Sequence, residues 1–193
     1  MPQTAKKAIR REMLAARARL SLEKRRQKSN AIGRRLCELA EYRDSHTVLF
    51  FVGFGTEVST LPMITHALEG GKTVVAPRVR QESGDLELRQ VQNPQEELSE
   101  GAMGILEPKS GSPEVPLRQI DLIVVPAVAW DTDGYRVGYG GGFYDRLLGH
   151  NENAVTVGLG FECQLIDRVP RAPHDLGVDV LVTEDRVLRF NQG

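Results

Sequence analysis

Apolar residues near the amino end of the chain are spaced as on two amphipathic helices. In the first helix they recur at steps of three or four residues, and Thr4 is suited to cap its amino end. Ser21 is suited to cap the second helix. The apolar stripes comprise Ile9, Met13, Ala16 and Leu20 in the first helix and Ile32, Leu36 and Leu39 in the second. Most cations of this segment then face outward, so the pattern predicts a pair of basic helices.

Beyond residue 43, short β-branched and aromatic runs alternate with helical stretches. Buried strands are predicted at residues 47–52, 72–77, 120–125, 155–159 and 178–182, and a half-exposed strand at 86–91. Helices are predicted at 59–68 and 94–98, and a loop rich in Gly, Pro and Ser at 101–116. Such alternation predicts an α/β fold, with an open, mostly parallel sheet covered on both faces. Without repeats or linkers, residues 1–193 are expected to form one domain.

The composition excludes several classes of protein. With 193 residues, 40% of them apolar, the chain can bury a stable core without metal ions or disulfides. Its two cysteines, Cys37 and Cys163, are far apart, which predicts packing thiols, a reducing compartment and a cytoplasmic protein. The longest apolar run, residues 122–130, is too short to cross a membrane, and no apolar signal region precedes it. A net charge of −1 argues against a general nucleic-acid binder, and we expect a monomer.

The small total charge conceals an asymmetry along the chain. Residues 1–35 contain 12 Lys or Arg and only two Glu, a net charge of +10, which leaves −11 for the remainder. Such a segment forms either a solvated surface or an anion-binding face, and it can dock onto the acidic body. Lys6 and Arg10 are four residues apart, so both project from one side of a helix and can bind one anion together.

Loops that follow the strands of an open parallel sheet are where ligands bind, and two of these loops carry an acid. In GFGTEVST, Glu57 precedes a predicted helix; it either caps that helix or contacts a ligand that the two glycines let approach. In GILEP, Pro108 holds Glu107 in an extended conformation, and this motif alone indicates a loop acid.

A third loop carries the strongest chemical pattern of the chain. The segment from Pro126 to Leu148, PAVAWDTDGYRVGYGGGFYDRLL, predicts a buried strand, a turn, a glycine-rich loop and a helix starting near Phe143. Glycines allow successive backbone N–H groups to surround a phosphate, and the helix amino terminus adds partial positive charge. Arg136 supplies a forked cation beside this loop, and Asp145 is suited to hold Mg²⁺ against phosphate oxygens. The spacing matches neither the Walker A nor the Rossmann glycine motif.

This third loop, together with the Lys6 and Arg10 pair, the GTEVST glutamate and the GILEP loop, resembles the 5-formyltetrahydrofolate cyclo-ligase family, also called methenyltetrahydrofolate synthetases. The resemblance runs in order over nearly the whole chain, and DTDGYRVGYGGGFYDRLL is its most specific part. It implies a three-layer α/β fold similar to ribose-5-phosphate isomerases and CoA transferases. It also implies ATP- and Mg²⁺-dependent cyclisation of 5-formyltetrahydrofolate to 5,10-methenyltetrahydrofolate, through a phosphorylated formyl group, with release of ADP and phosphate.

The resemblance also implies roles for individual residues. Arg136, Lys6 and Arg10 would act in catalysis, and Asp145 and Asp175 would bind Mg²⁺. The residues implied to bind ATP are Lys6, Arg10, Arg136, Val137, Gly138, Tyr139, Gly140, Gly141, Gly142, Phe143 and Tyr144. Those implied to contact the reduced folate are Val52, Glu57, Tyr139, Gly140, Gly141, Gly142 and Phe143. The chain departs from the family pattern at three positions, with Trp130, Val137 and Phe143 where Phe, Leu and Tyr are common. These changes in side-chain volume and ring polarity affect the expected fit of the substrate.

The implied chemistry suits these residues, since phosphoryl transfer needs positioning and charge neutralisation rather than a nucleophilic side chain. Glu57 is expected to accept hydrogen bonds from the pterin. Two alternatives remain open from the sequence. One is a sugar-phosphate isomerase or CoA-transferase relative that uses the same sheet without ATP. The other is a binding module whose basic helices hold nucleic acid, with an affinity that falls steeply with salt.

Overall fold

The amino-terminal segment forms the two expected helices. The computed structural model describes residues 2–80, 83–101, 104–172 and 175–190. Helix α1 spans Pro2–Ala18 and α2 spans Leu22–Glu38, followed by the short α3, Ala40–Asp44. Ser21 caps α2 as predicted, accepting from the Lys24 N–H at 3.2 Å. The predicted Thr4 cap is wrong: α1 already begins at Pro2, whose fixed φ suits a first helical turn.

The centre of the molecule is a seven-stranded sheet in the order β12-β11-β9-β6-β1-β2-β3. The five inner strands are parallel, and the two edge strands pair antiparallel. Their bounds are β1 Thr47–Leu49, β2 Thr73–Val79, β3 Leu86–Val91, β6 Leu122–Val125, β9 Val155–Leu159, β11 Val180–Val182 and β12 Val187–Arg189. The mostly parallel α/β sheet is thus confirmed, with an edge strand β12 that the sequence pattern missed.

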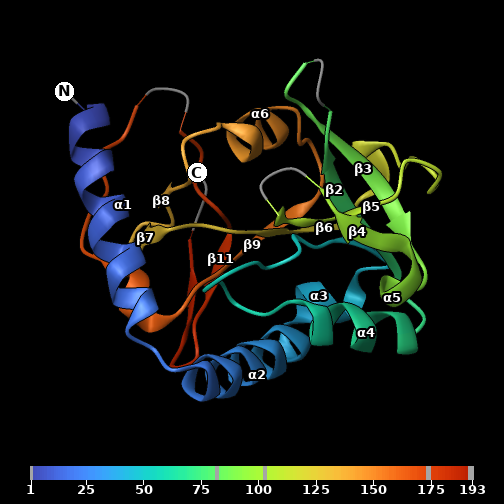
Figure 1. The fold of residues 1–193 in the computed structure, drawn as a ribbon, viewed down its shortest axis with the longest axis horizontal. Coiled ribbons are helices and arrows are strands. Elements are labelled where there is room, and N and C mark those ends of the chain that lie inside the picture. Colours follow the sequence, from blue (N-terminus) through green and yellow to red (C-terminus); the bar gives the residue numbers. More distant parts are fainter. Residues whose placement is uncertain (1, 81–82, 102–103, 173–174, 191–193) are drawn as a thin grey trace.

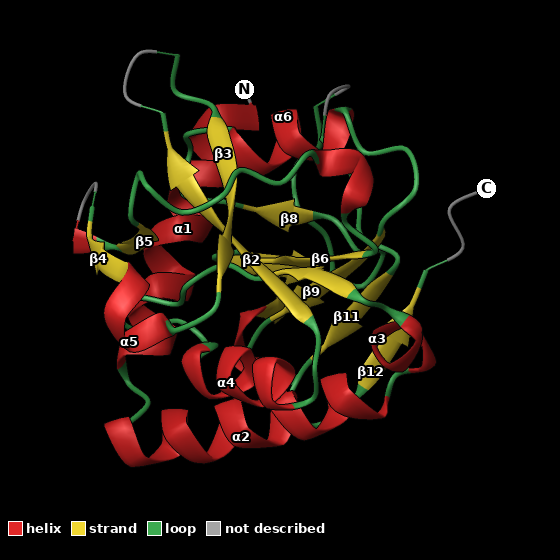
Figure 2. Ribbon diagram, turned by 90° about the vertical axis from the view of Figure 1, so that its right-hand side faces the viewer, coloured by secondary structure: helices red, strands yellow, loops and turns green. Residues whose placement is uncertain are grey.

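Both faces of this sheet are covered, which explains the continuous apolar runs in its strands. Along β6, Leu122 and Val124 pack with α2 and α4 (Leu61–Glu69), whereas Ile123 and Val125 pack on the opposite face with α6 (Phe143–Gly149). Figure 2 shows α2 and α4 on one side of the sheet and α6 on the other. The predicted three layers are therefore present.

Several predicted boundaries are wrong. The strand predicted at 47–52 ends at Leu49, and the predicted loop at 101–116 contains β5, Leu106–Pro108. Strand β5 pairs antiparallel with β4, Leu98–Glu100, which directly follows α5, Pro94–Glu97. Glu107 is accordingly a buried strand residue rather than a loop acid. This pairing joins two short polar segments, so no apolar periodicity announces it.

A second, three-stranded sheet connects α1 to the body. Its order is β10-β7-β8, with β7 Ala129–Asp131, β8 Arg136–Val137 and β10 Leu165–Ile166. Met13 of α1 packs on Val128, Ala129 and Val137, and α1 lies alongside β7 and β8 (Figure 1). The strand predicted to end at Trp130 is therefore part of this small sheet, which holds α1 beside the glycine-rich loop.

Trp130 is buried against the glycines of β9 and the residues after it. A Cβ atom placed on Gly158 would lie 2.5 Å from the indole ring, and one on Gly160 would lie 2.7 Å from it. The indole N–H donates to the carbonyl of Leu159 at 3.2 Å. The two glycines therefore make the space that this large side chain fills.

Both cysteines are free thiols, and only one packs as predicted. Cys37 is half-buried and packs against the core cluster of α2, whereas Cys163 is exposed because it lies in a short surface turn, Glu162–Gln164. In the part of the chain that the structure describes, no helix is long and apolar enough to cross a membrane.

Candidate active site

A narrow hollow lies where three neighbouring strands end. Strands β1, β6 and β9 are adjacent and parallel, so the segments after their carboxyl ends meet at one edge of the sheet. This is the edge where open α/β sheets bind ligands. The lining residues are Phe51, Glu57 and Val58 after β1, Pro126 and Ala127 after β6, Leu159 and Gln164 at β9, and Arg17 from α1.

A tight turn after β1 holds Glu57 at this hollow. The Glu57 N–H donates to the Phe54 carbonyl at 3.0 Å, and the Glu57 carboxylate accepts from the Phe54 N–H at 3.1 Å. Gly55 permits this turn with φ +58°, a conformation that L side chains rarely adopt. Helix α4 starts only at Leu61, so Glu57 caps its own turn and not that helix.

Glu57 is part of a hydrogen-bonded chain that starts on α1. Arg17 Nη2 donates to the Tyr139 hydroxyl at 2.7 Å, and Tyr139 in turn bonds to the Glu57 carboxylate. Burial raises the pKa of Glu57, an effect that its hydrogen bonds and the Arg17 charge oppose. Although Tyr139 is 44% exposed, desolvation raises its pKa to about 12, so the hydroxyl keeps the proton it donates.

The glycine-rich loop between β8 and α6 presents free backbone donors. Gly140 and Gly142 have φ of +111° and +67°, and Gly142 is the N-cap residue directly before α6. The N–H groups of residues 139–142 find no acceptor among the residues described. These are the features of an anion-binding loop, since successive free N–H groups can converge on phosphate oxygens.

Cations from α1 and β8 border this loop. Arg10 Nε donates to the Gly138 carbonyl at 2.6 Å, and its guanidinium lies 3.6 Å from where a Cβ on Gly140 would be. Lys6 pairs with Asp175 at 2.5 Å. Arg136, 6% exposed, pairs with Asp145 at 2.6 Å and donates to the Leu176 carbonyl at 2.9 Å. The structure thus brings together Lys6, Arg10, Arg136, Asp145, Asp175 and the glycine loop.

Burial decides the electrostatics of Arg136. Desolvation lowers its pKa, while the carboxylates of Asp145 and Asp175 act in the opposite direction. A buried guanidinium paired with one carboxylate and bonded to a backbone carbonyl is fixed in position, so it can offer directed hydrogen bonds.

A magnesium ion fits this arrangement only together with a nucleotide. Within the described ranges, no group of three or more His, Cys, Asp or Glu side chains could hold a metal ion. Mg²⁺ at nucleotide sites is commonly held by one or two carboxylates and the phosphates themselves. Asp145 and Asp175, both close to Arg136, can supply that number of carboxylates.

Not every residue predicted to bind a ligand faces the site. Val52 is buried in the core cluster of α2 and α4 and is not among the residues lining the hollow. Val137 is buried under α1. The Phe143 ring centroid lies 5.3 Å from the Arg146 guanidinium. The Tyr144 hydroxyl is buried and has no hydrogen-bond partner within the part of the chain that the structure describes.

The comparison with known proteins agrees with this geometry. A model of the 5-formyltetrahydrofolate cyclo-ligase family matches residues 2–184. The chain belongs to this family. The 5-formyltetrahydrofolate cyclo-ligase of Escherichia coli (strain K12) is 36% identical over 146 residues, which cover 74% of this chain and 80% of that protein. The Haemophilus influenzae enzyme of the same name is 31% identical over 178 residues, 90% of this chain and 95% of that one.

A solved structure extends the similarity to the fold. The 5,10-methenyltetrahydrofolate synthetase of Aquifex aeolicus is 37% identical to this chain and superimposes on it with a TM-score of 0.86. The aligned region covers 97% of this chain and 94% of that one. The predicted family and enzyme class of this cyclo-ligase are thereby confirmed. The match argues against the isomerase and CoA-transferase alternative.

The sequence pattern did not single out one cation of the candidate site. Arg17 is 2% exposed and is an exception to the prediction that cations of the basic helices face outward. A signal existed: Lys6, Arg10, Met13 and Arg17 follow one another at steps of four, three and four, which places them on one face of α1.

Asp131, the last residue of β7, is a second residue whose importance was missed. This fully buried carboxylate accepts from the N–H groups of Asp133, Tyr135 and Val169 at 3.0, 2.9 and 3.1 Å, and from Arg171 at 3.0 Å. It therefore ties the strand that carries Arg136 to the segment that leads to Asp175.

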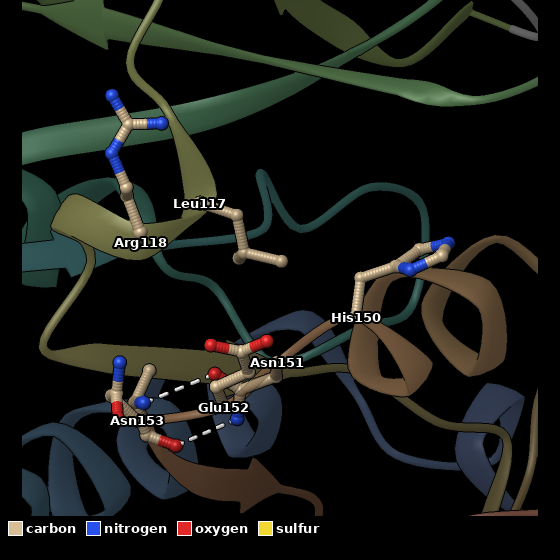
Figure 3. A pocket seen from close by; sticks show the side chains of 7 residues that line it. Leu117, Arg118, His150, Asn151, Glu152 and Asn153 are labelled. Atoms are coloured by element: carbon tan, nitrogen blue, oxygen red, sulfur yellow. Dashed lines mark hydrogen bonds between the residues drawn. The ribbon is translucent and has the colours of Figure 1, made fainter.

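A further hollow, of about 240 Å³, lies at the amino ends of β6 and β9, away from the candidate site (Figure 3). Its lining residues are Leu117, Arg118, His150, Asn151, Glu152, Asn153 and Ala154. Figure 3 shows the Asn151 side chain bonded to both backbone groups of Ala154, at 2.8 and 3.0 Å. These bonds close a surface turn, and none of the predicted site residues lies here.

Proposed function

We propose that this chain cyclises 5-formyltetrahydrofolate to 5,10-methenyltetrahydrofolate with ATP and Mg²⁺ as co-substrate and cofactor, releasing ADP and phosphate. The observation that carries the proposal is one continuous site with two chemically distinct halves. The glycine loop with free N–H groups, bordered by Lys6, Arg10 and Arg136, suits a polyphosphate. The hollow that contains Glu57 suits a ring with N–H donors, and Tyr139 joins the two halves.

The bond changes need no nucleophilic side chain. The formyl oxygen attacks the γ-phosphorus of ATP, forming an O–P bond while the bond to ADP breaks. Nitrogen 10 of the folate then attacks the formyl carbon and loses its proton, and the phosphate leaves with the former formyl oxygen. Converting this oxygen into a phosphate ester makes it a leaving group. The protein's part is to align the reactants and to neutralise charge on the transferred group.

Each cation of the site has a place in this scheme. Arg10, fixed on the Gly138 carbonyl, is suited to donate to the transferred phosphoryl group. Arg136, fixed by Asp145 and Leu176, is suited to do the same. Lys6, at the first turns of α1, is suited to bind the outer phosphates.

Asp145 and Asp175 would hold the Mg²⁺ that accompanies the nucleotide. When bound, the ion supplies additional charge neutralisation on the phosphates. In the structure both carboxylates are engaged by Arg136 and Lys6. The phosphates of a nucleotide compete for the same two cations, and this exchange would release the carboxylates to the metal.

The test is formation of methenyltetrahydrofolate from 5-formyltetrahydrofolate, followed by its absorbance, with and without ATP and Mg²⁺. We expect a signal only with both. Asp145→Ala and Arg136→Ala should each lower turnover by about 10²- to 10³-fold, as for the loss of a group aimed at developing charge. Folded wild-type protein that forms no product with ATP and Mg²⁺ would overturn the proposal.

A second measurement separates this function from the alternatives. ATP with Mg²⁺ should raise the melting temperature further as its concentration increases, whereas a sugar phosphate should leave the melting temperature unchanged. A stabilising sugar phosphate and an inert nucleotide would favour an isomerase relative. Affinity for nucleic acid that falls steeply with salt would favour the binding-module alternative.

A further inference from the structure

Arg17 is a buried cation with one nitrogen left without a partner. Its Nε donates to Thr56 Oγ1 at 3.0 Å, and its Nη2 donates to the Tyr139 hydroxyl at 2.7 Å. The third nitrogen, Nη1, is buried and has no hydrogen-bond partner among the described residues. A buried N–H group of a charged side chain is unfavourable unless some acceptor reaches it.

Arg17, like Arg10 but unlike Lys6 and Arg136, has no carboxylate partner among the described residues. Lys6 and Arg136 each pair with an aspartate, but none of the described Asp or Glu oxygens lies within 4.0 Å of the Arg17 guanidinium. Its two partners, Thr56 and Tyr139, are neutral groups that fix the orientation of the fork. The third nitrogen is thus a donor held in place without an acceptor among the described residues.

Arg17 borders the hollow that contains Glu57. The remaining walls are mostly apolar, formed by Phe51, Val58, Pro126, Ala127 and Leu159. In the structure these walls leave no space for a water molecule, so a ligand enters only where they part, and a single ring of a folate suits so narrow a site better than the whole molecule. Apolar walls with one acceptor and one donor can recognise a heterocycle by the order of groups along its edge.

The edge of a 2-amino-4-oxopteridine has the matching order of groups. The 2-amino group and the ring N3 are adjacent donors, and the 4-oxo oxygen beside them is an acceptor. A carboxylate accepts from two adjacent N–H groups, and a guanidinium next to it can donate to the oxygen. Glu57 and Arg17 offer this combination, joined through Tyr139.

We propose that Arg17 Nη1 donates a hydrogen bond to the 4-oxo oxygen of the pteridine while Glu57 accepts from N3 and the 2-amino group. Arg17 is then a specificity-determining residue of the folate half of the site. The proposal rests on the proposed function, since it takes a reduced folate as the ligand. It assigns to α1 a second task beyond the binding of phosphates by Lys6 and Arg10.

The test compares two ligands and three variants by calorimetric titration without ATP. The ligands are 5-formyltetrahydrofolate and its analogue that lacks the 4-oxo group. Arg17→Met should weaken binding of the first ligand by about ten- to a hundredfold, the range for one hydrogen bond to a charged donor. Binding of the analogue should change little, because it has no oxygen for Arg17 to contact. Arg17→Lys should restore part of the affinity for the oxo ligand.

Arg11→Met is the matched control, since Arg11 is an exposed arginine on the same helix. It should leave both affinities unchanged. In turnover, Arg17→Met should raise KM for the folate, leave KM for ATP unchanged and change kcat by no more than a fewfold. Melting curves of all variants establish that they are folded, and Arg17→Lys serves in place of Arg17→Met if the latter is not.

Equal losses of affinity for both ligands in Arg17→Met and Arg17→Lys would overturn the proposal and indicate a structural role for Arg17. Unchanged affinity for the oxo ligand would overturn it as well. Failure of the proposed function itself has another signature: wild-type protein would form no methenyltetrahydrofolate, whichever residue stands at position 17.

Discussion

The helices α1 and α2 are alike in composition and differ in what their cations do. On α1, Lys6, Arg10 and Arg17 point into the site, where they contact Asp175, the glycine loop and Tyr139. On α2, Lys28 pairs with Glu184 and Arg35 donates to the Asp185 carbonyl, so these cations dock the helix onto the acidic body. Others on α2, such as Arg26, are exposed. Burial and partners, rather than charge, distinguish a ligand-binding face from a docking face.

The largest expected difference between the helices is in turnover. Arg10→Met should lower kcat/KM by about 10²- to 10³-fold, because it removes a cation positioned over the glycine loop. Arg26→Met, an equal change in charge at an exposed position of α2, should have no measurable effect. Both are measured in the absorbance assay with saturating folate. Similar losses in the two variants would mean that the charge of the segment acts only as a diffuse field.

The next difference concerns the pH dependence of folate binding. Burial raises the pKa of Glu57 and the Arg17 charge lowers it, so removing that charge should raise it further. Because binding requires the ionised carboxylate, folate affinity should decline as pH falls through this pKa. The midpoint of the decline should therefore move to higher pH in Arg17→Met and stay in place in Arg26→Met. Glu57→Gln should abolish the pH dependence of folate binding. If the pH dependence persisted in this variant, another titrating group would be its cause.

The helix amino termini give a smaller contrast, in stability. Ser21→Ala should lower the free energy of unfolding by about 1 kcal/mol, because it removes the cap of α2. Ser21→Asp should retain most of that stability. Thr4→Ala should cost nothing, since α1 already starts at Pro2 and Thr4 is an exposed residue within the helix. Denaturant titration measures all three, and a loss in Thr4→Ala equal to that in Ser21→Ala would contradict the start of α1.

The smallest effect is expected at the docking face of α2. Lys28→Met should change stability by less than about 1 kcal/mol, because its pair with Glu184 is partly solvated. The hydrogen bond with Glu184 raises the pKa of Lys28. The contribution of this ion pair to stability is therefore present at neutral pH and is lost as pH rises through the raised pKa. Stability measured against pH should show wild type and variant converging in strongly alkaline solution, and a constant difference would exclude the ion pair as its source.

Much of the fold could be predicted because its signals are local. The apolar runs of β6 and β9, the Ser21 cap and the glycines before α6 each act within a few residues. Strands β5 and β12 were missed because edge pairing of short, partly polar segments depends on neighbours distant in sequence.

The same division applies to the candidate site. The Lys6 and Arg10 pair and the Arg136 to Asp145 segment are short motifs. For Arg17 the sequence indicates only its face of α1, and its contact with Tyr139 depends on how that helix packs. Val52 was assigned to the folate by resemblance, and packing instead places its side chain in the core.

The contact between Trp130 and the glycines at positions 158 and 160 has a consequence for how sequences of this kind can change. The indole occupies the space that any side chain at either glycine would need, because a Cβ atom there would lie less than 3 Å from the ring. Substituting a glycine alone creates a clash, and shrinking the tryptophan alone leaves a void. The three positions are therefore expected to vary in concert, with smaller rings at 130 accompanied by residues larger than glycine across the interface.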